Sequence, residues 1–346
     1  MDVVSVDKSR NLVEAKVVFG ESLNSHKGVN FPGAKLTTSS ITEKDWDDIL
    51  FGIENNVDFF ALSFVRSAHE VKNLKNFLIS KNAGIQVIAK IEMADALVNI
   101  DEILVAADGI MVARGDLGVE IGNEKVPIEQ KRLIGKARAQ GKPVITATQM
   151  LMSMVLQPTP SRAEASDVAN AVFDGSDALM LSNETATGIY PLKAVETMGR
   201  LIESAEQYQN KEQGIPFENE FIAPLEAAAV LLADKIKAKA ISCLTRSGHT
   251  ARSLSRLRPE SAIYAFVEGE KVRRQLALTR GVFVIPWKEV KSQDYTVFDD
   301  MAAELGRIGV LKRGDLSVFV AGIPTSQKQG TSNTVALRKY GEAIES

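Results

Sequence analysis

Three charged side chains stand where two short apolar runs end, and their types could serve one chemical site. Lys90 and Glu92 close the run that begins at Gln86, and Asp116 follows the run Gly109–Ala113. Such β-branched and apolar runs are typical of buried parallel strands. Residues two apart on a strand point to the same face, so Lys90 and Glu92 point together. A cation with two carboxylates predicts a site for a divalent metal and an anionic substrate.

Each of these motifs also has an ordinary structural interpretation. A Lys-x-Glu pair is commonly a solvated ion pair, and the tripeptide at Arg114 is a common turn sequence. Their shared position at the ends of buried strands favours a site, because α/β folds collect functional groups there.

The bulk composition is that of an ordinary globular protein. The chain has 346 residues, 45% hydrophobic and 25% charged, with a net charge of -3. The sequence contains no basic stripe of the kind that indicates nucleic acid binding. No apolar run approaches the roughly 18 residues of a membrane span. Cys243, the single cysteine, lies in an apolar run and is interpreted as a core residue. The absence of a disulfide framework and of a signal sequence predicts a cytoplasmic protein.

Strand and helix patterns alternate from Thr42 onward. The expected strands are 59–64, 86–91, 109–113, 143–148 and 178–182. The expected helices are 43–55, 67–81, 94–105, 127–140, 162–173 and 191–209, with a loop between 113 and 127. No Gly-rich phosphate fingerprint follows the first strand, so we favour a partial (β/α)8 barrel over a doubly wound sheet. The polar residues at the carboxyl ends of its strands are Lys90, Glu92, Asp116, Thr148 and Ser182.

Other modules flank this barrel. Residues 1–23 predict a hairpin that ends a small β lid domain, 24–209 the barrel domain, and 210–219 a polar linker. Gly28–Gly33 is the expected crossing between the first two modules. Residues 220–346 predict a C-terminal α/β regulatory domain with a mainly parallel sheet. Its expected strands are 240–244, 262–266, 282–285, 316–321 and 333–337, and its expected helices 224–237, 251–257, 272–278 and 297–308.

The C-terminal domain contains one candidate phosphate loop, Thr245–Thr250. Its residues are Thr245, Arg246, Ser247, Gly248, His249 and Thr250. Small hydroxyl residues and Gly before a helix present backbone N–H groups to an anion. An ordinary capped βα loop would have the same composition, so both interpretations stay open.

The ordered motifs of the chain resemble the pyruvate kinase family over nearly its whole length. They are Ile88–Glu92, Asp108–Glu120, Gly141–Met150, Arg162–Val172 and Met180–Thr185, with Lys27–Gly33 near the start and Gly314–Asp315 and Gly330–Asn333 near the end.

The resemblance implies a role for each strand-end residue. Lys90 would stabilise the phosphoryl group in flight from phosphoenolpyruvate to ADP, and Glu92 and Asp116 would bind Mg²⁺ or Mn²⁺. The backbone N–H groups of Gly115 and Asp116 would hold the substrate carboxylate. Thr148 would lie beside the methylene carbon that is protonated to give pyruvate.

The resemblance also implies ligands, partners and an oligomeric state. We expect a K⁺ ion, a phosphorylated effector at Thr245–Thr250, a homo-oligomer that is a tetramer in the family, and Ser182 on the nucleotide side. Two departures from the family pattern stand out. Asn183 replaces the usual Gly, and Asn tolerates the positive φ that a turn there could require. The N-terminal motif that binds substrate phosphate and K⁺ is missing, so we expect a truncated chain with impaired activity.

Two other functions stay open on the residues alone. A metal-dependent lyase or aldolase of pyruvate-like acids would also hold Mg²⁺ with carboxylates at strand ends, but would need no ADP, and Lys90 could then form a Schiff base. A non-catalytic, truncated paralogue that binds a phosphorylated effector is the third. Coding sequence upstream of Met1 would weaken this third alternative.

Overall fold

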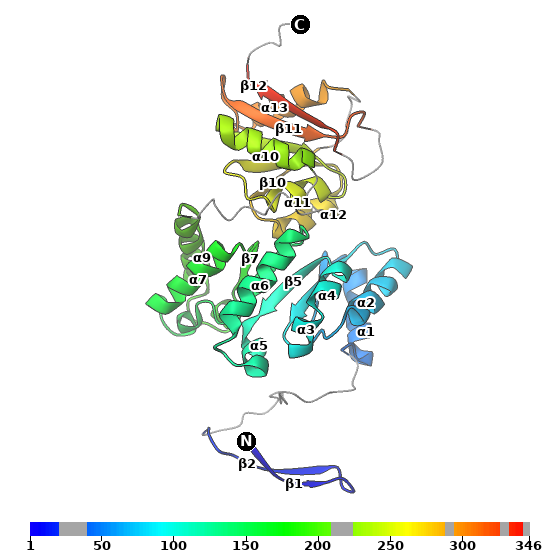
Figure 1. Cartoon of the computed structure of the whole chain (residues 1–346), viewed down its shortest axis with the longest axis vertical. Helices are drawn as coiled ribbons and strands as arrows, with labels where there is room; N and C mark the ends of the chain where they lie inside the picture. Colours follow the sequence, from blue (N-terminus) through cyan, green and yellow to red (C-terminus); the bar gives the residue numbers. More distant parts are fainter. Residues whose placement is uncertain (21–39, 209–223, 288–293, 326–331, 342–346) are drawn as a thin grey trace. The chain divides into compact units, whose positions relative to one another are not determined.

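The computed structural model describes residues 1–20, 40–208, 224–287, 294–325 and 332–341 (Figure 1). The chain divides into two compact units, Met1–Lys35 and Leu36–Ser346, which are described separately.

The first unit contains the predicted hairpin. Strands β1 (Asp2–Asp7) and β2 (Leu12–Lys16) pair antiparallel. In the turn, Asp7 Oδ1 accepts a hydrogen bond of 2.9 Å from the backbone N–H of Ser9. Asn11 has a φ of 51°, a left-handed conformation that asparagine tolerates. The predicted crossing Gly28–Gly33 lies outside the described residues.

The second unit begins with a five-stranded parallel sheet in the order β3-β4-β5-β6-β7. The strands are β3 (Phe59–Leu62), β4 (Gln86–Ile91), β5 (Gly109–Ala113), β6 (Val144–Ala147) and β7 (Ala178–Met180). Each strand from β4 to β7 pairs in parallel with the strand before it in the chain. A doubly wound sheet reverses its strand order, whereas this sheet keeps the single direction of a (β/α) barrel, as predicted.

Helices follow these strands, mostly where the sequence predicts them. They are α1 (Glu43–Glu54), α2 (Ala68–Ser80), α3 (Ala94–Val98), α4 (Ile100–Ala106), α5 (Arg114–Ile121), α6 (Val126–Ala139), α7 (Arg162–Asp174), α8 (Asn183–Ala186), α9 (Pro191–Glu206) and a 3-10 helix, Met152–Val155. Local signals set several starts. At α1, for example, the Thr42 N–H donates to Asp45 Oδ2 at 2.7 Å, and the Asp45 N–H donates to Thr42 Oγ1 at 3.3 Å.

Two of these expectations were wrong. The segment after β5 is the helix α5, not a loop. Gly and Asp are poor helix formers, and the contacts of Arg114 described below override that local preference. The single helix expected at 94–105 is divided into α3 and α4 at Asn99.

The two faces of the first sheet belong to different apolar clusters. Val87 packs in a large cluster to which α2 and α6 also contribute. Ile88 and Met111 belong instead to a separate cluster on the other face. Because side chains alternate along a strand, Lys90 and Glu92 share the face of Ile88. That face is the inner face of a barrel-type sheet.

The second sheet has five strands in the order β10-β9-β8-β11-β12. They are β8 (Ala240–Leu244), β9 (Ala262–Val267), β10 (Val282–Pro286), β11 (Leu316–Ala321) and β12 (Thr334–Lys339), with helices α10 (Pro224–Ile236), α11 (His249–Ser255), α12 (Glu270–Gln275) and α13 (Val297–Arg307). Only β12 runs antiparallel, so the sheet is mainly parallel, as predicted. Ile241 and Val318 pack with residues of α10 and α11, and Phe319 packs with Phe298 of α13. Helices therefore cover both faces.

Cys243 lies inside this second domain, as predicted. Its side chain is fully buried in β8, and burial raises the pKa of its thiol, as does the neighbouring Glu226. It is a core residue. In the parts of the chain that the structure describes, no helix is long and apolar enough to cross a bilayer.

The second domain contacts the amino ends of the first sheet's strands. Gln275 Nε2 donates to the Gly84 carbonyl at 3.0 Å, and Arg274 Nε pairs with Asp58 Oδ2 at 2.8 Å. Leu278 packs against the inner cluster that contains Ile88. Lys90 and Glu92 lie at the opposite, carboxyl end of β4. The predicted linker 210–219 falls outside the described residues.

Candidate active site

Lys90 and Glu92 form a close pair at the end of β4. Lys90 Nζ lies 2.7 Å from Glu92 Oε1 and donates a second bond, of 2.8 Å, to Ser63 Oγ. Glu92 is 1% exposed and Lys90 is 25% exposed, so the ammonium lies at the boundary between the inner face and solvent. The structure confirms that the two side chains point together.

A backbone group fixes the other oxygen of Glu92. Its Oε2 accepts a hydrogen bond of 2.7 Å from the N–H of Phe64, which follows β3. Phe64 has a φ of 53°, an unusual value for an aromatic residue. The carboxylate therefore joins the ends of β3 and β4, and a strained backbone residue of the kind that collects at functional sites supplies the donor.

Asp116 lies in the first turn of α5 rather than on a strand end. Its side chain is partly buried and has no hydrogen bond or ion pair with any described residue. The amino end of a helix carries partial positive charge, which stabilises a carboxylate there. Asp116 thus keeps all its acceptor positions for another ligand.

Thr148 and Gly115 are in direct contact. Thr148 Oγ1 accepts a hydrogen bond of 2.8 Å from the backbone N–H of Gly115 and donates one of 2.6 Å to the Ala147 carbonyl. Thr148 has a φ of 72°, which is rare for a β-branched residue. The N–H that the resemblance assigns to the substrate carboxylate is therefore engaged by Thr148.

The packing around position 115 does not itself require glycine. A Cβ on Gly115 would lie 3.5 Å from Thr148 Oγ1, an ordinary contact distance. A close approach by a ligand would be the remaining reason for glycine there.

Arg114 is an organising residue that the sequence analysis missed. Its guanidinium is 9% exposed and donates from Nη1 to both oxygens of Asp167, at 2.8 and 2.6 Å. Its Nη2 donates to the Thr148 carbonyl at 2.7 Å. A charged residue directly after a fully apolar strand was the available signal. Arg114 ties α5 and α7 to the end of β6.

Glu92 and Asp116 are the candidate ligands for a divalent ion. The described residues contain no group of three or more Asp, Glu, His or Cys side chains that could hold a metal. Mg²⁺ commonly takes one or two carboxylates and completes its shell with substrate oxygens and water. Glu92 and Asp116 fit that chemistry, since both are hard oxygen donors, although Lys90 and Phe64 already occupy part of the acceptor capacity of Glu92.

Ser182 begins a short turn around another buried carboxylate, which the sequence analysis also left out. Glu184 is fully buried, and its two oxygens accept from the N–H of Ser182 at 2.8 Å and the N–H of Leu151 at 3.0 Å. Asn183 begins α8 and does not have a positive φ. No left-handed residue is therefore needed at that position.

The loop Thr245–Thr250 follows β8, where the strand order of the second sheet reverses. Strand β9 lies on one side of β8 and β11 on the other. Open α/β sheets bind ligands outside the carboxyl ends of strands at such a switch point. This position adds a topological argument to the composition of the loop.

Internal contacts shape the loop. Thr245 Oγ1 accepts from the Gly248 N–H at 3.0 Å, and Gly248 has a φ of 80°. Thr250 Oγ1 lies 3.1 Å from Ser332 Oγ, so the segment before β12 also reaches this loop. Arg246 is exposed. No hydrogen bond or ion pair joins its side chain to another described residue.

Comparisons with known protein families agree along most of the chain. The family model described as "Pyruvate kinase, barrel domain" matches residues 1–195. The one described as "Pyruvate kinase, alpha/beta domain" matches residues 225–337.

Individual proteins give the same result. A pyruvate kinase of Sporosarcina psychrophila is 43% identical over 99% of this chain, and one of Staphylococcus aureus is 42% identical over 99%. A crystal structure of a pyruvate kinase from Cryptosporidium parvum covers 90% of this chain at 37% identity with a TM-score of 0.82, and 64% of that chain is matched. The present chain spans 59% of the length of the two curated relatives.

Proposed function

The chain belongs to the pyruvate kinase family, and from this premise we propose that its first sheet carries a site that transfers the phosphoryl group of phosphoenolpyruvate to ADP. The products would be pyruvate and ATP. The observation that supports the proposal most strongly is the 2.7 Å pair of Lys90 and Glu92 on the inner face of the sheet.

Lys90 would act through its fixed positive charge. Phosphoryl transfer depends mainly on positioning and on electrostatic stabilisation of the oxygens of the moving group. Ser63 and Glu92 hold the ammonium in place, so little reorganisation is needed when the substrate arrives. An ammonium in an ion pair is a poor nucleophile, which argues against a Schiff base at Lys90. The family match gives no support to the lyase or to the non-catalytic alternative.

Glu92 and Asp116 would hold Mg²⁺, or Mn²⁺. Asp116 contributes an unengaged carboxylate, and Glu92 has lone pairs beyond those that Lys90 and Phe64 use. When bound, the ion supplies positive charge to the substrate oxygens. The family further implies K⁺.

Thr148 and the first turn of α5 would contact the methylene carbon and the carboxylate of the substrate. The Thr148 hydroxyl keeps a proton at Oγ1 that could pass to the methylene carbon, with water as the alternative donor. The N–H groups of Gly115 and Asp116 could both donate to the substrate carboxylate once the Gly115 N–H no longer donates to Thr148 Oγ1. Ser182 would lie on the nucleotide side.

The second domain would regulate this site. We assign a phosphorylated small molecule to the loop Thr245–Thr250, with Arg246 as a charge-assisted donor. A homo-oligomer and a cytoplasmic location are further proposals from family membership.

Binding of phosphoenolpyruvate, measured by calorimetry on the whole chain, tests the barrel site. We expect binding that requires Mg²⁺ and weakens by about tenfold or more in Lys90→Met, since a charge-assisted contact is lost. Lys72→Met is the matched control, because Lys72 is exposed in α2 and has no ion pair with a described residue. Binding without Mg²⁺, or equal binding in Lys90→Met, would contradict the proposal.

A coupled assay for pyruvate provides the second measurement. Pyruvate formation should depend on ADP and fall by about a hundredfold or more in Lys90→Met, but not in Lys72→Met. The chain spans 59% of the length of its curated relative. The test of the proposal is therefore the rate of each variant relative to wild type, and not the absolute turnover. ADP-independent release of pyruvate would indicate a different reaction.

A further inference from the structure

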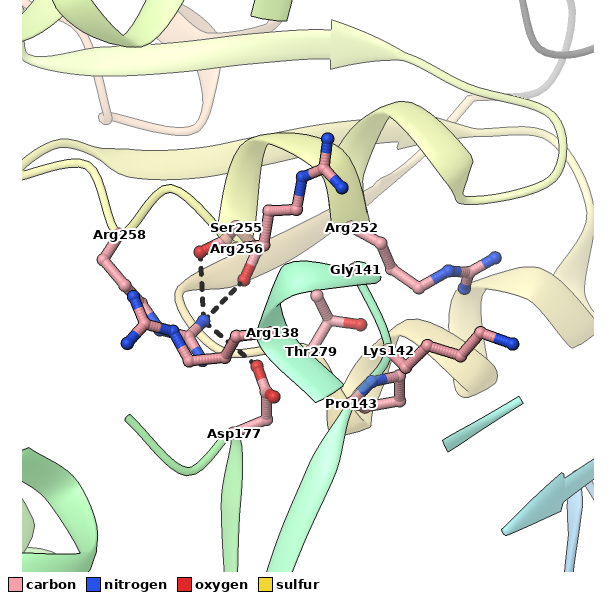
Figure 2. A pocket seen from close by; sticks show the side chains of 10 residues that line it. All are labelled: Arg138, Gly141, Lys142, Pro143, Asp177, Arg252, Ser255, Arg256, Arg258 and Thr279. Atoms are coloured by element: carbon pink, nitrogen blue, oxygen red, sulfur yellow. Dashed lines mark hydrogen bonds and ion pairs between the residues drawn. The ribbon is translucent and has the colours of Figure 1, made fainter. Parts of the chain in front are cut away.

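A basic pocket lies where the end of α6 meets α11 and the residues after it (Figure 2). Its cationic lining residues are Arg138, Lys142, Arg252, Arg256 and Arg258, and its single carboxylate is Asp177. The first two cations belong to the domain of the parallel sheet, and the three others belong to the C-terminal domain. The pocket is therefore strongly positive and has contributions from both domains.

Arg138 is the least compensated of these cations. Its residue is 9% exposed, and its side chain has no hydrogen bond or ion pair with another described residue. Burial, with smaller contributions from Arg258 and Arg280, lowers the pKa of Arg138 to about 10, although Asp177 opposes the shift. A buried cation without a close counter-ion is costly. A position of this kind is expected to have an anionic partner.

Asp177 does not provide that partner, because other donors already engage it. Its Oδ1 lies 3.1 Å from Arg258 Nη1 and accepts from the Arg280 N–H at 3.4 Å. Its Oδ2 accepts from the Val144 N–H at 3.0 Å. Asp108 attracts Lys142 and Arg252, and Glu226 attracts Arg256, so Arg138 is the lining cation whose charge depends on Asp177 alone.

Several donors that line the pocket are buried, and Arg138 Nε, Arg258 Nε and Thr279 Oγ1 have no acceptor among the described residues. Buried polar atoms of folded proteins nearly always have a partner, so a group of unsatisfied donors at one place indicates an absent acceptor. Guanidinium groups and a hydroxyl match the oxygens of a tetrahedral oxyanion.

We propose that this pocket binds a phosphate group, either inorganic phosphate or the single phosphoryl group of a small metabolite, and thereby links the two domains. The enclosed space is small, about 10 Å³, which is room for about one water molecule. A phosphate group is larger than this space, so its binding requires the lining arginine side chains to move outward and expose their buried donors. This site is separate from the barrel site and from the loop Thr245–Thr250.

Titration of the whole chain with inorganic phosphate tests the proposal, at constant pH and ionic strength, by calorimetry and by thermal unfolding. Phosphate should bind and raise the midpoint of unfolding more than chloride does. Arg138→Met should weaken phosphate binding by about tenfold or more, because it removes charge-assisted contacts. Without phosphate, the same variant should unfold at an equal or higher temperature, since it removes an uncompensated buried cation.

Two controls separate this pocket from general charge effects and from the other predicted phosphate site. Arg313→Met makes the same change in net charge at an exposed residue before β11 and should leave phosphate binding unchanged. Arg246→Met alters the loop Thr245–Thr250 and should leave the Arg138-dependent part of binding intact. Equal phosphate binding by wild type and Arg138→Met, or no phosphate-specific binding at millimolar concentration, would overturn the proposal.

Glycerol 3-phosphate distinguishes the two sources of the phosphate group. Tighter binding than that of inorganic phosphate, lost in Arg138→Met, would support a phosphorylated metabolite. Weaker binding, with the same dependence on Arg138, would support inorganic phosphate. Binding of both compounds without dependence on Arg138 would refute the site.

Discussion

The backbone N–H of Gly115 donates a hydrogen bond of 2.8 Å to Oγ1 of Thr148, which links the first turn of α5 to the end of β6. Arg114 reinforces the same junction, because its Nη2 donates to the Thr148 carbonyl at 2.7 Å. The hydroxyl and the carbonyl of Thr148 thus both accept hydrogen bonds from the segment that carries Asp116. A change at Thr148 should therefore affect stability as well as chemistry.

Thr148→Val should destabilise the protein by about 1–3 kcal/mol, because the Gly115 N–H would lose its acceptor. Thr148→Ser keeps the hydroxyl and should stay within about 0.5 kcal/mol of wild type. Unfolding in urea, monitored by circular dichroism, gives both values. Equal stability of the two variants would show that the hydrogen bond contributes nothing to the fold.

Asp116→Asn should separate metal binding from stability. The amide loses most of the attraction to a divalent ion, so Mn²⁺ affinity should fall by about tenfold or more. Because the Asp116 carboxylate has no partner among the described residues, the free energy of unfolding should change by less than about 0.5 kcal/mol. Electron paramagnetic resonance of free Mn²⁺ measures the affinity. Unchanged affinity would remove Asp116 from the metal site.

Arg114 and Asp167 should show strong coupling in a double-mutant cycle. The pair has two hydrogen bonds, at 2.8 and 2.6 Å, and Arg114 is almost fully buried. We expect Arg114→Met and Asp167→Leu to be coupled by about 1–3 kcal/mol, since a buried charge loses its counter-ion in the Asp167 single variant.

The exposed pair Arg307 and Glu304 provides the matched control for that cycle. Its atoms are also close, at 2.6 Å, but Arg307 is 71% exposed. Solvent screening should make its coupling clearly smaller than that of the Arg114 pair. Coupling of the Arg114 pair no larger than that of the exposed pair would contradict its proposed role in holding α5 and α7 together.

Glu164 should make stability depend on acid pH. Burial raises the pKa of its carboxyl, but hydrogen bonds from Ser153 and Ser161 outweigh that effect and hold the pKa below its ordinary value of 4.5. Because the folded pKa is the lower one, this carboxylate stabilises the fold above pH 4.5, and the contribution is lost as pH falls through the folded pKa.

The variant Glu164→Gln checks this pH dependence. Its cost should be about 1 kcal/mol at pH 7, typical of a lost helix cap, and should shrink toward zero as pH falls below 4.5. Urea unfolding at pH 7 and at successively lower pH measures the difference from wild type. A difference that is constant with pH would show that the ionised form of Glu164 has no special stabilising role.

Local signals in the sequence were enough to place most helices and strands. The bounds of β4 were predicted correctly, because an apolar run and a charged end define them within a few residues. The starts of α1 and α7 also depend on nearby residues, since Thr42 and Ser161 each accept a hydrogen bond from the residue three positions later. Alternation along the strand likewise predicted that Lys90 and Glu92 point to the same face, and their ion pair confirms it.

Contacts between distant residues decided the rest. The sequence indicated a loop after β5, whereas Arg114 pairs with Asp167, 53 positions away, and the segment becomes α5. Asp116 consequently lies in a helical turn, and the Gly115 N–H bonds to Thr148, 33 positions away. No local pattern encodes such pairings, because they depend on how parallel strands bring their carboxyl ends to one edge. The basic pocket around Arg138 has the same origin, since α6 and α11 meet only in the folded protein.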